Sequence, residues 1–193
     1  LNYLLWRNPE NLKTRSILAL GFNPDDSILL DKEFSKKANL LKNPGRVLFD
    51  SLSRPEFGPV EEWFKSGRKV QTEVAGKRVL VEGLVELGPS FGADGNLITS
   101  TETYLKLFPA NPKGSIEIGL VKLVANSNSQ KVSQILNKSL PNDVRVLTKD
   151  EFIEFEKNYW KTSTAIGFIF SLGAFMGFIV GCVVVYQILY SDV

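Results

Sequence analysis

One loop of the chain has residue types that could bind a ligand: Ser90-Phe91-Gly92-Ala93-Asp94-Gly95-Asn96. A phosphate-binding loop requires the pattern G-x-x-x-x-G-K-[ST], and this stretch has two glycines but no lysine. A calcium loop requires several carboxylates at alternate positions, and only Asp94 and Asn96 offer oxygen ligands. We therefore expect a tight structural loop whose glycines adopt positive φ.

A second dense stretch, in which two prolines and a glycine restrict the backbone, is Ser53-Arg54-Pro55-Glu56-Phe57-Gly58-Pro59. Arg54 and Glu56 could form an ion pair beside this rigid turn. Such a loop is usually structural, but loops held by a scaffold also commonly carry binding. The candidates for contact with a partner protein, or for coupling between domains, come from both loops: Arg54, Glu56, Phe57, Phe91, Asp94 and Asn96.

Composition excludes most familiar catalytic chemistry. The sequence has no histidine and a single cysteine, Cys182, which rules out common zinc sites, Ser-His and Cys-His pairs and intrachain disulfides. The neighbouring carboxylates of Asp25 and Asp26, or of Glu61 and Glu62, could be cast as acid and base in a hydrolase. Adjacent residues usually point apart, so we expect no catalytic residue, no metal ligand and no cofactor site.

The charge balance argues against a nucleic-acid partner. Lys and Arg number 23 and Asp and Glu number 21, and they are scattered along the chain. Without a concentrated basic field, phosphates are not gathered at the surface. The pairs Lys36-Lys37 and Arg68-Lys69 are too short to be more than solvated faces.

Residues 162–191 contain no charged residue, a run of 30 positions. A helix needs only about 20 residues to cross the hydrocarbon core of a bilayer. The alternative is a buried core helix of a soluble protein, but such helices rarely stay uncharged for so long. Aromatic residues of the kind that favour the membrane interface flank the run: Tyr159, Trp160, Tyr186 and Tyr190. We therefore predict a transmembrane helix in a lipid bilayer.

Small residues should line one half of this helix. At 100° per residue, six of them fall within about 160° of arc: Gly167, Ser171, Gly173, Ala174, Gly177 and Gly181. Helices in lipid associate through close packing, which such a face permits. Glycine is also generally more common in membrane helices, which is the alternative explanation. The packing interpretation favours a helix bundle over a simple anchor.

A helix is expected to begin at the capping box Thr148-Lys149-Asp150-Glu151, in which Thr148 and Glu151 satisfy each other's amides. Phe152, Phe155 and Tyr159 follow on one face, and no Gly or Pro interrupts the chain before Ile166. The pattern predicts one unbroken helix from Thr148 to Tyr190. Such a helix would be a stiff lever able to carry motion across the membrane surface.

The remaining sequence predicts a mixed α+β domain over residues 1–147, followed by a connecting helix over 148–161 and the membrane helix over 162–191. Strands are expected around a turn at residues 8–11, and alternation over residues 70–87 predicts the clearest hairpin. The last third predicts a βαβ-like unit: strand 116–124, helix 129–140 and strand 144–147. Further elements are expected at 32–41, 47–49, 59–64, 97–98 and, behind a capping box at residues 99–102, up to Phe108.

Both ends of the sequence are expected to be cut from a longer chain. Leu1 stands first, and nothing near it has the pattern of a signal peptide. The sequence stops at Val193, too soon after the apolar run for a charged flank to set topology.

Five blocks of sequence, taken in order, resemble the DevC type of ABC exporter permease of cyanobacteria, within the wider MacB- and FtsX-like permease group. These blocks are Gly21-Phe22-Asn23-Pro24-Asp25-Asp26, Val47-Leu48-Phe49-Asp50, Ser53-Arg54-Pro55-Glu56-Phe57-Gly58-Pro59, Ser90-Phe91-Gly92-Ala93-Asp94-Gly95-Asn96-Leu97 and Gly167-Phe168-Ile169-Phe170. The resemblance covers the chain almost from end to end. It implies a piece holding most of a large periplasmic domain and the second membrane helix.

The resemblance also implies a function and partners. The parent would be a multi-pass subunit of the inner (plasma) membrane, with residues 1 to about 160 on the periplasmic side. It would work as a homodimer with a separate ATPase subunit, a periplasmic membrane-fusion adaptor and a TolC-like outer-membrane channel. It would pass force to the periplasm for export of a lipid or glycolipid-like substrate. The family contributes no catalytic residue, and the chain has no loop for ATP.

Two other classes of function remain open at this point. The apolar run lies last, which is compatible with a tail-anchored extracytoplasmic binding module. The paired carboxylates alone suggest a membrane-anchored hydrolase.

Overall fold

The computed structural model describes residues 1–26, 32–90, 92–112, 114, 116–162 and 165–191. The chain divides into two compact units, Leu1–Lys122 and Leu123–Val193. The first unit holds every strand of the described chain, and the second holds three helices. Strands and helices are thus both present, as the expected α+β class requires.

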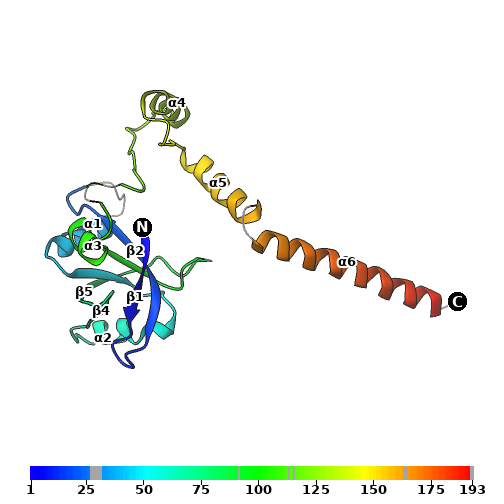
Figure 1. Cartoon of the computed structure of the whole chain (residues 1–193), viewed down its shortest axis with the longest axis horizontal. Helices are drawn as coiled ribbons and strands as arrows, with labels where there is room; N and C mark the ends of the chain where they lie inside the picture. The colour runs from blue at the N-terminus through cyan, green and yellow to red at the C-terminus, as the bar shows by residue number, and fades with distance from the viewer. Residues whose placement is uncertain (27–31, 91, 113, 115, 163–164, 192–193) are drawn as a thin grey trace. The chain divides into compact units, whose positions relative to one another are not determined.

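The first unit is built on a closed barrel of six strands (Figure 1). Around the barrel the strands follow the order β1 (Asn2–Arg7), β2 (Thr14–Phe22), β6 (Asn96–Ser100), β3 (Arg46–Asp50), β5 (Lys77–Val85) and β4 (Gln71–Val74). Closure leaves the barrel without a long exposed strand edge. Both predicted hairpins are confirmed: β1 with β2, expected around the turn at residues 8–11, and β4 with β5, expected from alternation.

The barrel has two halves with the same pairing pattern. Each half begins with an antiparallel hairpin, β1–β2 or β4–β5. The second strand of each hairpin then pairs in parallel with the last strand of the other half, so that β2 meets β6 and β5 meets β3. The two last strands, β3 and β6, pair antiparallel with each other. The halves therefore exchange strands, and each is completed only by the other.

The barrel interior is packed with apolar side chains from alternate positions of the strands. Trp6 is fully buried in it, with its ring 5.1 Å from that of Phe49. A second apolar cluster forms on the outer face of β3 and β6, where Leu48 and Ile98 lie opposite each other. The segment formed by α1 (Lys32–Ala38) and the 3-10 turn η1 (Asn39–Lys42) contributes Phe34 and Leu41 to this cluster.

Two further helices pack on the barrel, on opposite sides in the view of Figure 1. Helix α2 (Val60–Lys65) follows the 3-10 turn η2 (Pro55–Phe57), and α3 (Thr101–Leu107) follows β6 directly. The cap of α3 lies one residue later than expected. Ser100 accepts the Thr103 N–H, whereas the Thr99 hydroxyl is buried and donates to the Arg46 carbonyl. Helix α3 packs closely on β2 at Gly21, where a Cβ would lie 2.5 Å from the Tyr104 ring.

The prediction of a βαβ-like unit in the last third of the chain is only partly confirmed. Helix α4 (Ser129–Ser139) is present, but residues 116–124 and 144–147 form no strand. A strand requires a hydrogen-bonded neighbour, and within the described chain neither segment pairs with one. The Asn137 side chain instead acts as the neighbour of Val146, accepting its N–H and donating to its carbonyl.

The second unit ends in two helices, α5 (Lys149–Thr162) and α6 (Ala165–Ser191). The capping box at the start of α5 is confirmed: Glu151 accepts the Thr148 N–H, and the Thr148 hydroxyl accepts the Glu151 N–H. The hydrogen bond from the Thr148 backbone lowers the pKa of Glu151. Helix α5 is described to Thr162 and α6 from Ala165, and residues 163 and 164 lie outside the described residues, so the single helix expected from Thr148 to Tyr190 stays a prediction.

Candidate functional site

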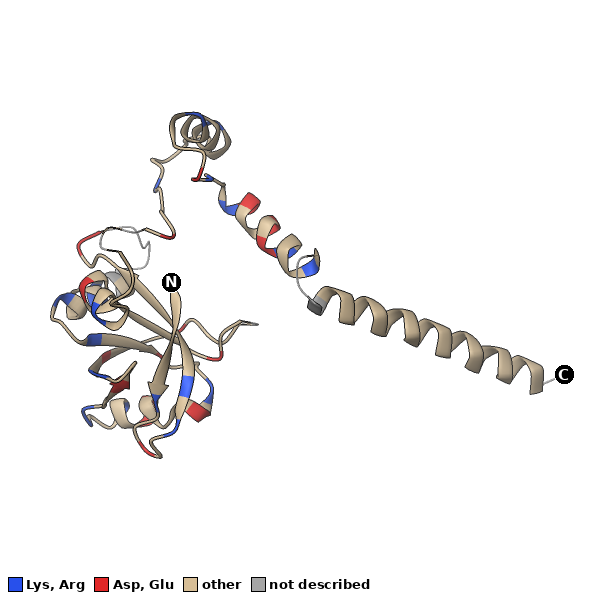
Figure 2. Cartoon of the chain, in the orientation of Figure 1, with Lys and Arg blue, Asp and Glu red and all other residues tan. Residues whose placement is uncertain are grey.

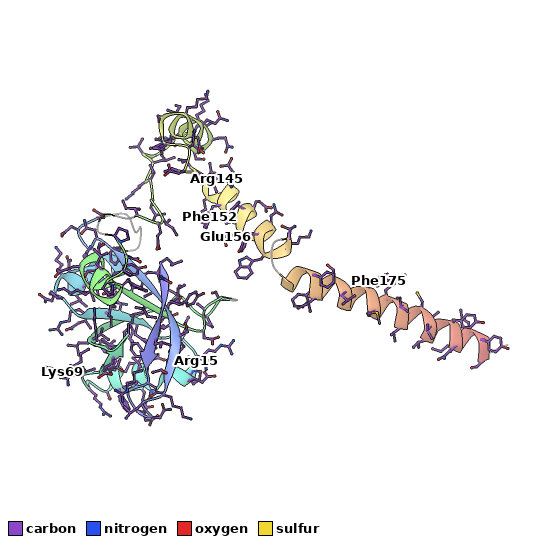
Figure 3. The ribbon with its side chains drawn as sticks, in the orientation of Figure 1. Arg15, Lys69, Arg145, Phe152, Glu156 and Phe175 are labelled. Carbon is purple, nitrogen blue, oxygen red and sulfur yellow. The ribbon has the colours of Figure 1, made fainter. Side chains whose placement is uncertain are left out.

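The candidate site lies at one end of the barrel and begins with Arg15, labelled in Figure 3. Arg15 lies opposite Trp6 in the β1–β2 ladder, two positions before the buried Ile17. Alternation therefore places it on the inward row of β2, at the point where that row reaches the barrel end. Its guanidinium lies over the Phe57 ring, 5.8 Å from the centroid, so that it caps the apolar interior.

Asp94 joins two arginines at this end of the barrel. The Arg15 Nη2 donates to Asp94 Oδ2 over 2.5 Å, and the Arg54 Nε lies 2.8 Å from Oδ1. The Arg54 N–H also donates to the Asp94 carbonyl at 3.0 Å. The hydrogen bond from Arg15, with the positive charge of Arg54, lowers the pKa of Asp94, and the bond to Asp94 raises the pKa of Arg15.

Glu56 completes the group, with its carboxylate 3.7 Å from Arg15 Nη1. The expected ion pair between Arg54 and Glu56 is not formed, because Arg54 turns to Asp94. With two guanidinium groups and two carboxylates the cluster is electrically balanced. It does not present the net positive charge that a phosphate site needs. We call Arg15, Arg54, Glu56 and Asp94 the barrel-end cluster.

A buried carboxylate, Asp50 at the end of β3, holds the two loops of the cluster in place. It has no exposed surface and accepts from the backbone N–H groups of Leu52, Leu87 and Gly88. It also accepts from the Asn96 side-chain amide over 2.7 Å. One side chain thus connects the loop after β3 with the loop between β5 and β6.

Two candidates do not reach the surface. Phe57 is fully buried, packs edge-on against Phe49 at 6.4 Å, and gives its carbonyl to the Trp6 indole N–H at 3.0 Å. Asn96 is buried, and its side-chain amide donates to the Asp50 carboxylate and to the Gly88 carbonyl. The structure therefore gives Phe57 and Asn96 no surface for contact with a partner. They instead hold the loops of the site in place. Phe91 lies outside the described residues.

The expected backbone of the Gly92 and Gly95 loop is also corrected, because neither glycine has positive φ. Gly95 is instead required by close packing. A Cβ there would lie 2.7 Å from both the Phe57 ring and the Ser53 Oγ. The glycine therefore allows the Asp94 loop to lie directly on the loop after β3.

Two leucines extend the site with apolar surface. Leu52 and Leu87 are 53% and 54% exposed, and both donate their N–H to the same Asp50 oxygen. They are therefore neighbours in space on the two loops of the site. Arginine is enriched at surfaces that contact another protein, so the two arginines of the barrel-end cluster carry this interpretation and the leucines add apolar area to it.

Two of the four other carboxylates considered from the sequence, those of Asp25 and Glu61, lie in surface ion pairs. Asp25 lies 2.7 Å from Lys42, and Glu61 lies 2.6 Å from Lys65 one helical turn away. Neither arrangement brings two carboxylates together for acid and base chemistry. Across the described residues, no group of three or more His, Cys, Asp or Glu side chains could hold a metal ion.

Helix α6 forms the second candidate surface. Its stretch Gly167–Ser191 is long and apolar enough to cross a membrane, and Figure 2 shows α6 without a charged residue. The Ser171 hydroxyl donates to the Gly167 carbonyl at 2.8 Å, so it presents no unpaired donor. A Cβ added at Gly173, Gly177 or Gly181 would meet nothing within 4 Å. The predicted small-residue face, which also includes Ala174, is therefore open in the single chain at these three glycines, whereas a Cβ at Gly167 would meet the Lys161 carbonyl.

The aromatic residues expected at the membrane interface lie near the ends of the apolar stretch. Tyr159 and Trp160, at the end of α5, have their rings edge to face at 5.9 Å. Tyr186 and Tyr190 stack at 6.0 Å one turn apart near the end of α6. Phe175, labelled in Figure 3, is an exposed apolar side chain between them.

Sequence reasoning missed Arg15 and Asp50, which hold the site together. Arg15 has no distinctive neighbours in the sequence, and its role depends on a strand alternation that places it at the barrel end. Asp50 follows the buried run Val47-Leu48-Phe49, and an aspartate directly after such a strand could have indicated a loop-holding carboxylate.

Comparisons with known proteins do not extend this description. No family model matches the sequence, and neither a curated protein nor a solved structure matches the chain.

Proposed function

We propose that the chain is part of the transmembrane permease subunit of an ABC-type exporter, with ATP hydrolysed by a separate subunit. The barrel and the segments around it form an extracytoplasmic part, and α6 is one membrane helix of a multi-pass parent. The substrate class is a lipid or glycolipid-like molecule. The role is the transmission of force to a periplasmic adaptor and an outer-membrane channel.

The observation that carries the proposal is α6. Its 25-residue apolar stretch has none of its side chains buried inside the chain. An apolar helix of this length is stable when lipid or other helices surround it. A face of small residues over half its circumference, open in the single chain, favours neighbouring helices over lipid alone.

The barrel supports the same role. Its strand exchange joins the two halves of the barrel, and the barrel-end cluster with Leu52 and Leu87 offers a charged and apolar surface for a partner. The five sequence blocks that resemble the DevC type include both loops of this surface. The adaptor is therefore the partner that we assign to it.

The test is to express the parent reading frame with its neighbouring genes and purify it through a tag on this subunit. We expect an ATPase subunit and an adaptor to co-purify, and further membrane spans to follow Val193. A parent that holds a single span and co-purifies with neither protein would overturn the proposal.

A tail-anchored binding module is the second candidate, because α6 is the single candidate span among the described residues. In that case the barrel-end cluster would bind its partner without an ATPase. Binding that persists after deletion of the ATPase gene, with no loss of export, would favour this alternative.

A further inference from the structure

Helix α5 presents an exposed face of apolar and aromatic side chains. At 100° per residue, five of them fall within about 160° of arc. We call these five side chains the α5 apolar face: Phe152, Ile153, Phe155, Tyr159 and Trp160. Their exposed fractions run from 38% for Trp160 to 49% for Tyr159. The opposite side of the helix carries Asp150, Glu151, Glu154, Lys157 and Lys161. The helix is therefore amphipathic, and its apolar face requires a cover.

Two charged residues, Lys149 and Glu156, fall within the same arc as the α5 apolar face. Lys149 lies in the first turn, where its long stem allows the ammonium group to reach water. Glu156, labelled in Figure 3, lies one turn after Phe152 on the same side. Because a carboxylate must stay hydrated, Glu156 limits how deeply this face can enter an apolar layer.

The covalent link to α6 indicates which cover is available. Trp160 stands five residues before Ala165, the first residue of α6. Five residues span at most about 18 Å, so the end of the face stays near the start of the apolar helix wherever the barrel lies. Tyr and Trp are the side chains that favour the boundary between lipid and water. A bilayer crossed by α6 therefore reaches the α5 apolar face first.

The length of the face indicates how α5 lies on that bilayer. The headgroup layer is about 5–8 Å thick on each side of the hydrocarbon core. An upright α5 would hold Phe152 about 12 Å further from the core than Trp160, outside this layer. A helix that lies along the surface keeps all five side chains within the layer.

Arg145, in the segment before α5, lies beside the same face. Its guanidinium is 5.3 Å from the centroid of the Phe155 ring. The side chain is exposed and, within the part of the chain that the structure describes, forms no ion pair. A guanidinium binds phosphate through paired hydrogen bonds, and lipid phosphates lie at the depth of interfacial aromatic rings.

We propose that α5 is an interfacial helix, which lies along the membrane surface with its apolar face in the headgroup layer of a phospholipid bilayer and Arg145 at the lipid phosphates. The proposal rests on the assignment of α6 to a bilayer and not on the transport role. The helix has three lysines and four Asp or Glu residues, so burial of the apolar face, and not attraction to anionic lipid, holds it there.

Spin-label depth measurements on the full chain in phosphatidylcholine vesicles test this orientation. In a Cys182→Ala background, Phe152→Cys and Tyr159→Cys place labels two turns apart on the apolar face, and Glu154→Cys places one on the charged side. Accessibility to oxygen and to a nickel chelate gives the depth of each label. We expect equal depths at Phe152 and Tyr159, with Glu154 nearer water. An upright helix would separate the first two labels by about 10 Å and would overturn the proposal.

A label on α6, in the variant Phe175→Cys, separates failure of the proposal from failure of the membrane assignment. High oxygen and low nickel accessibility at Phe175 places α6 in hydrocarbon. Nickel access at Phe175 would contradict that assignment, and the proposal with it. Low nickel access at Phe175 with full nickel access at Phe152 would exclude the interfacial helix alone. Low access of both reagents at Phe152 would show that a protein surface covers the face, which also excludes it.

Neutralising one carboxylate provides an independent test. Glu156→Gln removes the charge within the apolar face and should lower the nickel accessibility of the Phe152 label by roughly twofold, because the face can then enter more deeply. Glu154→Gln is the matched control, since Glu154 pairs with Lys157 on the charged side. Equal effects of the two variants would show that this face does not meet the bilayer.

Discussion

Arg15 and Asp94 stand 79 residues apart in the sequence, and the Arg15 guanidinium donates to the Asp94 carboxylate over 2.5 Å. The contact joins a residue of the first hairpin to the loop before the last strand. It therefore connects the two halves of the barrel at the end where the candidate site lies.

The first prediction concerns pH. The hydrogen bond from Arg15 and the charge of Arg54 lower the pKa of Asp94 in the folded chain. This carboxylate therefore contributes stability above its unfolded pKa of about 3.9, and the contribution is lost as the pH falls through the lower folded pKa. Asp94→Asn should lower the Tm at pH 7, and its difference from the wild type should shrink as the pH falls from about 4 toward 2.

Thermal unfolding of the full chain in detergent, followed by circular dichroism, measures this difference. Glu102→Gln is the control, because Glu102 pairs with Lys106 on the surface of α3. A Tm difference for Asp94→Asn that is the same at pH 7 and pH 2 would contradict the prediction.

The second prediction concerns Asp50. Asp50→Ala removes the acceptor of three backbone N–H groups and the Asn96 amide. Unsatisfied buried donors cost about 1–3 kcal/mol each, and water can reach the donors of the two exposed leucines. We expect the free energy of unfolding to fall by about 2–4 kcal/mol in urea titrations read by tryptophan fluorescence. Asp25→Ala, at an exposed ion pair, should change it by less than about 0.5 kcal/mol.

The third prediction concerns Gly95. Gly95→Ala brings a methyl group against the Phe57 ring and the Ser53 hydroxyl, and overpacking of this kind costs about 1–3 kcal/mol. The same urea titration measures the loss. Gly119→Ala has open space around its Cβ and serves as the control. Equal stability of the two variants would show that the loops are not in close contact.

The fourth prediction concerns Arg54, whose side chain is about half exposed while it reaches Asp94. Arg54→Glu should weaken binding of the proposed adaptor by about tenfold or more, because it replaces an interface arginine with the opposite charge. Surface plasmon resonance with the purified adaptor immobilised measures the affinity of each variant. Lys65→Glu is a charge reversal at an exposed i,i+4 pair on α2 and should leave the affinity unchanged.

The fifth prediction concerns α6. Gly177→Leu adds bulk to the small-residue face without a clash inside the chain. Close helix packing in a membrane contributes about 1–2 kcal/mol, so association should weaken by roughly five- to thirtyfold. Energy transfer between labelled chains in bilayers reports the change. Val183→Leu adds bulk on the opposite side, and an equal effect there would exclude a specific packing face.

Local elements of the fold could be predicted from the sequence where the signal is local. The turn at residues 8–11 identified the first hairpin, alternation of apolar residues identified the second, and the side chains of Thr148 and Glu151 identified the start of α5. The barrel itself could not be predicted, because its closure depends on parallel pairings such as Leu20 with Ile98, which join distant parts of the chain.

The candidate site was predicted in part for the same reason. Turn residues marked the loops that carry Arg54 and Asp94, but no local pattern shows that Arg54 pairs with Asp94 instead of Glu56. The apolar, β-branched composition of residues 116–124 also misled. It reports that a segment suits a sheet, and it cannot report whether a neighbouring strand is present.

The exchange of strands between the two halves of the barrel has a consequence for how this domain forms. While the chain is being made, the first hairpin has no parallel neighbour until β6, at Asn96–Ser100, has been synthesised. Neither half can mature first and serve as a template for the other, and contacts between such distant residues form slowly. The domain should therefore acquire its structure late and in one cooperative step, after Ser100 has been synthesised.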